Sequence, residues 1–190
     1  MRIIAGRFKG RVLHSFRGRN IRPTSDRLRE TLFNILREQL SGATVWDAFA
    51  GTGALGLEAL SRGARFAMFT ERSRQAVKLL LKNVNLLGIT GETEVVHADA
   101  IDWVATTTHR FDMIFLDPPY DFRSYVDLAR AIGAAQVCNP AGTVVLEHNR
   151  ASSGVEKLVE TCRPYRQLRQ GDSVLSFFSG EEVNRNFNKL

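Results

Sequence analysis

Segments typical of buried strands alternate with helical segments along most of this sequence, and this alternation limits the possible folds more than any other feature. Short apolar runs of the kind found in buried strands occupy residues 44–50, 65–71, 93–99, 111–117 and 142–148. Helical periodicity fills the intervening residues 54–62, 74–87 and 124–135. Alternating units predict an α/β fold with a parallel, doubly wound sheet, whose ligands bind at the carboxyl ends of the strands.

The two ends of the chain depart from this pattern. Residues 2–16 resemble a short hairpin with its turn between Gly6 and Gly10, and a helical pattern follows Asp26. Near the other end, residues 165–170 and 173–179 form a second hairpin-like pair that would add one antiparallel strand to the sheet. The polar residues 181–190 are expected to form a frayed tail.

The charge is concentrated at the N-terminus. Residues 1–29 hold nine lysines and arginines and one acid, Asp26, so this segment carries +8 and leaves −2 for the rest of a chain whose net charge is +6. A basic N-terminal segment on a nearly neutral body favours a polyanionic partner, and nucleic acid in particular. An anionic membrane fits less well, because residues 1–29 lack a sustained amphipathic helix and the chain has no apolar run long enough to span a bilayer.

Cysteine usage and the N-terminal sequence favour a cytoplasmic protein. Cys138 and Cys162 are the only cysteines, and they show no metal-ligand spacing, so we expect no metal site. Two buried free thiols are the simplest interpretation, and a disulfide or a catalytic thiol are the alternatives. The first ten residues lack the apolar stretch of a signal peptide.

A glycine-rich loop follows the first strand of the alternating region. Residues 51–56 read GTGALG, which is the G-x-G-x-x-G pattern of a loop that approaches a bound nucleotide cofactor closely. Glu71 ends the next strand, 20 residues after Gly51, where a carboxylate can accept both hydroxyl groups of a ribose. NAD and S-adenosylmethionine both fit these two features.

Two further acids favour S-adenosylmethionine. Asp47 stands four residues before Gly51, where its charge would repel a pyrophosphate but would suit the ammonium group of a methionine tail. Asp99 ends the third strand and could accept a hydrogen bond from the amino group of adenine. The alternatives are that Asp47 and Asp99 cap the turns that follow them and that Glu71 is a solvated surface acid.

The tetrapeptide Asp117-Pro118-Pro119-Tyr120 follows the fourth strand and indicates chemistry on a planar amine. The two prolines fix the backbone and remove two N–H donors, so the Asp117 carboxylate and the Pro118 carbonyl form an acceptor-rich turn. Acceptors of this kind can orient an NH2 group towards a methyl sulfonium. The aromatic ring of Tyr120 offers a surface on which a flipped-out base can stack.

These motifs together resemble a known family. The segments DAFAGTGALGLEAL, FTE, HADA and LDPPY are similar to class I S-adenosylmethionine-dependent methyltransferases that act on exocyclic amines. The N-terminal RIIAGRFKGRVL and IRPTSDRLRETLFNIL, with the terminal GDSVLSFF, resemble the bacterial small-subunit (16S) ribosomal RNA guanine-N2-methyltransferases of the RsmD type. The resemblance covers about residues 2–179 and implies a Rossmann-like, seven-stranded and mostly parallel sheet with one antiparallel strand and a short N-terminal extension. It also implies methyl transfer from S-adenosylmethionine to the 2-amino group of one guanine.

The motifs, the charge pattern and the resemblance together predict roles for individual residues. The expected catalytic residues are Asp117, Pro118, Pro119 and Tyr120. The expected cofactor-binding residues are Asp47, Phe49, Gly51, Thr52, Gly53, Glu71, Asp99 and Ala100, with Thr24 and Arg27 on the segment that closes over the cofactor. The expected RNA-binding residues are Arg7, Lys9, Arg11 and Arg22. We therefore divide the chain into an RNA-binding extension (1–23), a methyltransferase domain (24–180) and a polar tail (181–190), and expect a monomer whose partner is small-subunit ribosomal RNA, either free or in an assembly particle.

Three other functions remain open from the sequence. Adenine also presents a planar amine, so the tetrapeptide alone fits an adenine-6-amino methyltransferase acting on DNA or RNA. A non-catalytic ribosome assembly factor could keep the cofactor fold, although it would have no chemical need for the tetrapeptide. A dehydrogenase would need an acid or base beside a hydride acceptor, and the sequence offers only isolated histidines for that role.

Overall fold

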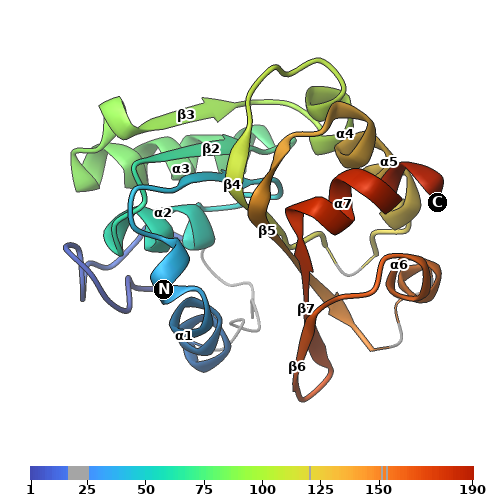
Figure 1. Cartoon of the computed structure of the whole chain (residues 1–190). Helices are drawn as coiled ribbons and strands as arrows, with labels where there is room; N and C mark the ends of the chain where they lie inside the picture. Colours follow the sequence, from blue (N-terminus) through green and yellow to red (C-terminus); the bar gives the residue numbers. More distant parts are fainter. Residues whose placement is uncertain (17–25, 120, 151, 153) are drawn as a thin grey trace. The chain divides into compact units, whose positions relative to one another are not determined.

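The computed structural model describes residues 1–16, 26–119, 121–150, 152 and 154–190 (Figure 1). The chain divides into two compact units, Met1–His97 and Ala98–Leu190. Each unit consists of strands and helices that follow one another along the chain, as the alternating sequence pattern predicts.

The first unit contains a short hairpin and the first strands of the sheet. In the hairpin, Arg2 and Val12 form an antiparallel bridge, and the N–H of Gly10 donates to the carbonyl oxygen of Ile3 at 2.9 Å. The elements that follow are α1 (Asp26–Ile35), η1 (Arg37–Gln39), β1 (Thr44–Asp47), α2 (Ala54–Ser61), β2 (Phe66–Thr70), α3 (Arg74–Leu87), η2 (Thr90–Glu92) and β3 (Thr93–Val96).

The second unit contains the remaining strands and the C-terminal helices. Its elements are α4 (Ala100–Val104), β4 (Phe111–Leu116), α5 (Tyr125–Ala135), β5 (Cys138–Asn149), α6 (Val155–Thr161), β6 (Arg166–Gln170), β7 (Ser173–Ser179), α7 (Gly180–Asn186) and η3 (Phe187–Lys189). Strand β7 is antiparallel to both β5 and β6, which confirms the expected antiparallel strand.

The described strands form one seven-stranded sheet in the order β3-β2-β1-β4-β5-β7-β6. The pairs β1–β2, β2–β3 and β4–β5 are parallel. The predicted α/β fold with a mostly parallel, doubly wound sheet is therefore confirmed.

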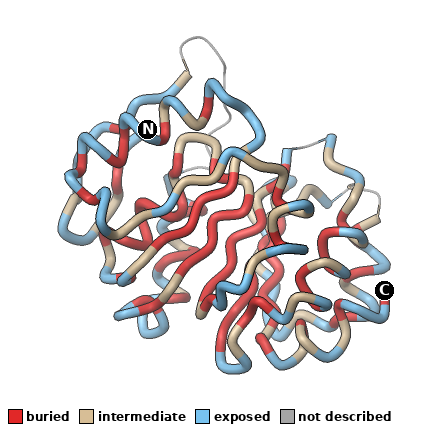
Figure 2. Tube along the Cα trace, turned by 90° about the horizontal axis from the view of Figure 1, so that it is seen from above, coloured by how far each residue is buried: buried red, intermediate tan, exposed pale blue. Residues whose placement is uncertain are grey.

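The core of each unit lies along its strands (Figure 2). The largest fully buried side chains of the first unit include Trp46 and Phe69, and those of the second include Phe115 and Phe177. Fully burying one side chain of this kind contributes about 1.5–3 kcal/mol. The strands that carry these side chains, β1, β2, β4 and β7, are buried along most of their length, as expected for a sheet covered on both faces.

Local signals fix the ends of α3, whose bounds match the sequence prediction. The Ser73 side chain caps the helix by accepting a hydrogen bond from the N–H of Ala76, and Gly88 ends it with a φ of 69°. Only glycine adopts that left-handed conformation without steric cost, so the helix stops there. Ala76, Leu80 and Leu87 on the inner side of α3 are buried together with Asn83.

The prediction of a frayed polar tail is wrong. Residues after Ser179 form α7 and η3, and Val183, Phe187 and Leu190 are at most 5% exposed. These three apolar residues recur at the spacing of one helical face, and the polar residues between them conceal that pattern. Helices α4 and α6 also form where no helix was predicted. None of the helices in the described residues has the length and apolar character needed to cross a membrane.

Candidate functional site

The glycine loop after β1 is built as the sequence predicts. Gly51 and Gly53 have φ values of 54° and 86°, and the N–H of Gly53 donates to the carbonyl oxygen of Ala50 at 2.7 Å. A Cβ atom on Gly53 would lie 2.4 Å from Cδ1 of Leu80 on α3, whereas one on Gly51 would meet nothing within 4 Å. Gly53 therefore allows the loop to pack against α3, and Gly51 leaves open space beside the backbone, as a cofactor loop requires.

Glu71 lies beside this loop, as predicted. Its Oε2 accepts a hydrogen bond from the N–H of Gly51 at 2.8 Å, and its Oε1 accepts one from the N–H of Ser73 at 2.7 Å. The side chain is partly exposed, and each carboxylate oxygen has a further lone pair with which it could accept a hydroxyl group. The structure thus brings Glu71 and the glycine loop together.

Asp47 is buried at the end of β1. It is 1% exposed, and its Oδ2 accepts a hydrogen bond from the N–H of Gly56 on α2 at 2.9 Å. Burial raises the pKa of Asp47 to about 7, which outweighs the lowering effect of the Gly56 hydrogen bond. Asp47 therefore supports the start of α2, which agrees with the alternative role of a capping group. Phe49 and Thr52, the other residues predicted to bind the cofactor here, are partly exposed on the loop between β1 and α2.

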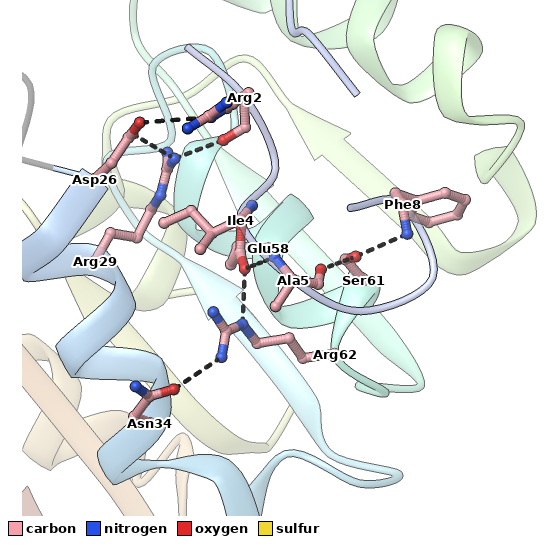
Figure 3. A network of polar contacts seen from close by, with 10 residues as sticks. All are labelled: Arg2, Ile4, Ala5, Phe8, Asp26, Arg29, Asn34, Glu58, Ser61 and Arg62. Atoms are coloured by element: carbon pink, nitrogen blue, oxygen red, sulfur yellow. Dashed lines mark hydrogen bonds and ion pairs between the residues drawn. The ribbon is translucent and has the colours of Figure 1, made fainter. Parts of the chain in front are cut away.

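The N-terminal hairpin, residues 1–16, docks on α2 through a buried carboxylate (Figure 3). We call this segment the arm. Glu58 is 0% exposed and accepts hydrogen bonds from the N–H groups of Ile4 and Ala5 at 2.7 and 3.0 Å. The same carboxylate forms an ion pair with Arg62 at 2.7 Å. The arm is therefore held by a paired, fully buried charge.

Ser61, one turn further along α2, provides a second anchor for the arm. Its hydroxyl group donates to the carbonyl oxygen of Ala5 at 2.5 Å and accepts from the N–H of Phe8 at 3.0 Å. Its carbonyl oxygen accepts from the N–H of Arg7 at 2.8 Å. A Cβ atom on Gly6 would lie 1.8 Å from that same carbonyl oxygen, so only glycine allows this close approach.

The basic side chains predicted to bind RNA differ in their surroundings. Arg7, Lys9 and Arg11 are all exposed on the arm. Arg7 forms an ion pair with Glu92, and its guanidinium lies over the ring of Phe8 at 4.6 Å. The Arg7 charge is thus partly compensated within the protein.

In the second unit, Asp99 directly precedes α4. Its Oδ1 accepts a hydrogen bond from the N–H of Ile101 at 2.9 Å, so the side chain caps the helix. Capping is the alternative that the sequence left open for this residue, and it does not prevent the second carboxylate oxygen from accepting another donor. Ala100 follows as the first, buried residue of the helix.

The predicted catalytic turn follows β4 directly. Asp117 is partly exposed, Pro118 is buried and Pro119 is exposed. The N–H of Phe122 donates to the carbonyl oxygen of Pro119 at 2.9 Å, which closes the turn after the two prolines. The Asp117 carboxyl is close enough to α5 for its charge to contribute to the raised pKa of Tyr125, although burial is the larger cause.

Three of the predicted site residues lie outside the described part of the chain, and two residues that hold the arm were not predicted. Thr24, Arg22 and Tyr120 lie outside the described residues, and Arg27 is exposed on α1. Glu58 and Ser61 were missed, although a charged residue on a helix rich in leucine is the kind of signal that could have found them. Both cysteines are buried and free, as expected, and burial raises the pKa of each thiol to about 12.

Comparison with known proteins identifies the family. Residues 1–179 match the family model described as Conserved hypothetical protein 95. The chain belongs to this family. The Haemophilus influenzae protein named ribosomal RNA small subunit methyltransferase D is 40% identical over 125 residues, which cover 64% of this chain and 65% of that protein. The chain thus spans slightly less than two thirds of that relative.

Solved structures agree with the observed fold of this Conserved hypothetical protein 95 family member. Escherichia coli YhhF superposes with a TM-score of 0.81 and 30% identity, covering 94% of this chain and 97% of YhhF. The Thermus thermophilus 16S rRNA N2 G1207 methyltransferase RsmC, solved with AdoMet and guanosine, superposes with a TM-score of 0.70 and 24% identity over 86% of this chain and 44% of RsmC. Together with the family match, these likenesses confirm the predicted class I methyltransferase fold and the resemblance to RsmD-type proteins.

Proposed function

We propose that this protein transfers a methyl group from S-adenosylmethionine to the 2-amino group of a guanine in small-subunit ribosomal RNA. The observation that carries the proposal is the acceptor turn at residues 117–119 directly after β4, in a chain that also has a glycine loop bordered by Glu71. Membership of a family that includes a small-subunit RNA methyltransferase D supports the same substrate class.

The residues of the glycine loop fit an adenosine cofactor. Gly51 leaves open space beside its backbone, and Glu71 can accept the ribose hydroxyl groups while it holds the N–H of Gly51. We assign the adenine amino group to the Asp99 carboxyl group and the methionine ammonium group to the Asp47 carboxyl group. When bound, S-adenosylmethionine supplies an electrophilic methyl group on a sulfonium.

The turn at residues 117–119 would hold the nucleophile. The Asp117 carboxylate and the Pro118 carbonyl accept the two hydrogens of the guanine 2-amino group, which directs the nitrogen lone pair towards the methyl carbon. An amine held in this way could take the methyl group of S-adenosylmethionine, which would leave as S-adenosylhomocysteine, and the methylated nitrogen would release one proton to solvent. Asp117 stabilises the positive charge that develops on this nitrogen. Tyr120, by its place in the motif, would stack on the target base.

The arm would bind the phosphates around the target. Lys9 and Arg11 are exposed and lie in a segment with a large excess of positive charge. Arg7 would contribute less because it forms an ion pair with Glu92, and Arg22, the fourth expected RNA-binding residue, lies outside the described residues. A base within a helix must leave the stack to reach the turn, so an unpaired or presented guanine is the expected target. We further propose an assembly particle as the substrate and a monomeric enzyme acting in the cytoplasm.

Methyl transfer by the wild-type chain and by Asp117→Ala tests this proposal. The wild type should transfer label from S-adenosylmethionine to unmodified small-subunit RNA or particles. The Asp117→Ala variant should lose transfer by at least about 100-fold, because it lacks the acceptor that orients the amine. Its affinity for S-adenosylhomocysteine should stay close to that of the wild type. A folded variant that loses cofactor binding as well, or keeps transfer, would contradict the role of Asp117.

A further inference from the structure

The side chain of Asn83 joins the arm to the glycine loop. Asn83 lies on α3 and is 0% exposed. Its Oδ1 accepts a hydrogen bond from the N–H of His14 at 2.7 Å, and its Nδ2 donates to the carbonyl oxygens of His14 at 3.1 Å and Thr52 at 2.9 Å. One buried amide therefore contacts the backbone at the end of the arm and the backbone at the centre of the loop.

A buried amide at this position needs both partners. Asn83 shares the inward side of α3 with Leu80, Val84 and Leu87, where an apolar residue would satisfy packing. A buried amide is costly unless its donors and acceptor are paired, and here both hydrogens and the oxygen have partners. The two bonds that Asn83 makes to the N–H and the carbonyl oxygen of His14 also resemble the paired bonds between neighbouring strands, so they fix the end of the arm against α3.

The loop depends on the same helix at two points. Thr52, whose carbonyl oxygen accepts the hydrogen bond from Nδ2 of Asn83, stands between the two positive-φ glycines. Leu80, three residues before Asn83, lies so close to Gly53 that a Cβ atom there would overlap its Cδ1. A displacement of the arm at His14 would thus be transmitted to Thr52 through the buried side chain of Asn83.

We propose that Asn83 is a positioning residue that couples the arm to the cofactor loop. RNA bound to the arm stabilises the position of His14, which stabilises Asn83 and hence the loop conformation that binds the cofactor. Because linkage is reciprocal, a bound cofactor strengthens RNA binding by the same factor. This inference rests on the proposed roles of the arm and the loop, and adds a connection between them.

The coupling is measured from four affinities. Labelled S-adenosylhomocysteine, which has no methyl group to transfer, is titrated by equilibrium dialysis with and without saturating unmodified small-subunit particles. In the wild type the particles should tighten its binding by about 5-fold or more. In Asn83→Leu this ratio should fall to about 1, because leucine fills a similar volume but cannot bond to either backbone.

Two further variants separate coupling from a loss of folding. His14→Pro removes the N–H that donates to Oδ1 and leaves the core of α3 intact, and it should also reduce the ratio. Asn85→Leu changes an exposed asparagine on the same helix and should keep the wild-type ratio. A wild-type ratio of 1 when both ligands bind, or an unchanged ratio in folded Asn83→Leu and His14→Pro, would overturn the coupling. A wild-type chain that transfers no methyl group and binds neither ligand would instead refute the proposed function on which the coupling rests.

Discussion

Replacement of Glu58 should detach the arm and destabilise the first unit. The carboxylate accepts two arm N–H groups and pairs with Arg62, whose side chain is 11% exposed. Glu58→Gln removes the charge and replaces two carboxylate oxygens by a single amide oxygen. That oxygen would have to serve the two arm N–H groups and the Arg62 guanidinium, which now share two acceptors. Removing one partner of a buried ion pair costs about 3–5 kcal/mol, so we expect a loss of that size in the free energy of unfolding.

Two measurements separate a local from a global effect. Urea unfolding gives the loss in the free energy of unfolding, and limited trypsin digestion after Lys9 and Arg11 reports release of the arm. Gly6→Ala tests the same docking from the other side, because its Cβ would lie 1.8 Å from the carbonyl oxygen of Ser61. Both variants should be cleaved faster in the arm than the wild type.

An exposed glutamate provides the matched control. Glu30 lies on the exposed side of α1, and Glu30→Gln should change the free energy of unfolding by less than about 0.5 kcal/mol. If Glu58→Gln unfolds at the same urea concentration as this control, and its arm is cleaved at the wild-type rate, then the buried carboxylate does not hold the arm and our reasoning is refuted.

Three further predictions concern the loop and the arm. Asp47→Asn should stabilise the protein relative to the wild type, by an amount that grows to about 4 kcal/mol as the pH rises from about 4 to 7. Burial raises the pKa of the Asp47 carboxyl to about 7, so in this range the folded wild type holds a proton that the unfolded chain has lost. Equal shifts of the urea midpoint at pH 5 and pH 8 would contradict this. Gly53→Ala should lose about 1–3 kcal/mol of stability because of its φ of 86°, whereas Gly91→Ala, which meets nothing within 4 Å, should not; similar melting temperatures for the two would count against a strained loop. Replacing Lys9 and Arg11 by Gln should lower the salt dependence of RNA binding by about 1.5 in the log–log slope, and an equal charge loss on α3 should not; an unchanged slope would remove the arm from the RNA interface.

The fold could be predicted from the sequence where local signals decide it. Helix α3 begins after a capping serine and ends at a glycine with positive φ, and both signals are visible in the sequence. The glycine loop and Glu71 also come together as predicted, because a βαβ unit fixes their relation whatever the rest of the chain does.

Contacts between distant residues could not be predicted in this way. The bonds from Ile4 to Glu58 and from His14 to Asn83 join residues 54 and 69 positions apart, and no local pattern encodes them. The sequence marks only that a polar residue occupies an inward helix position. The C-terminal helix is a different case, since the spacing of Val183, Phe187 and Leu190 indicates one buried face that the polar neighbours obscured.

Nucleoside analysis tests the central claim most directly. The wild-type chain is incubated with labelled S-adenosylmethionine and small-subunit RNA or particles that lack native modifications, and the digested RNA is separated to identify the labelled nucleoside. The proposed function predicts label in 2-methylguanosine, and none when Asp117→Ala replaces the wild type. Label in 6-methyladenosine, or no label although the chain binds both cofactor and RNA, would contradict it.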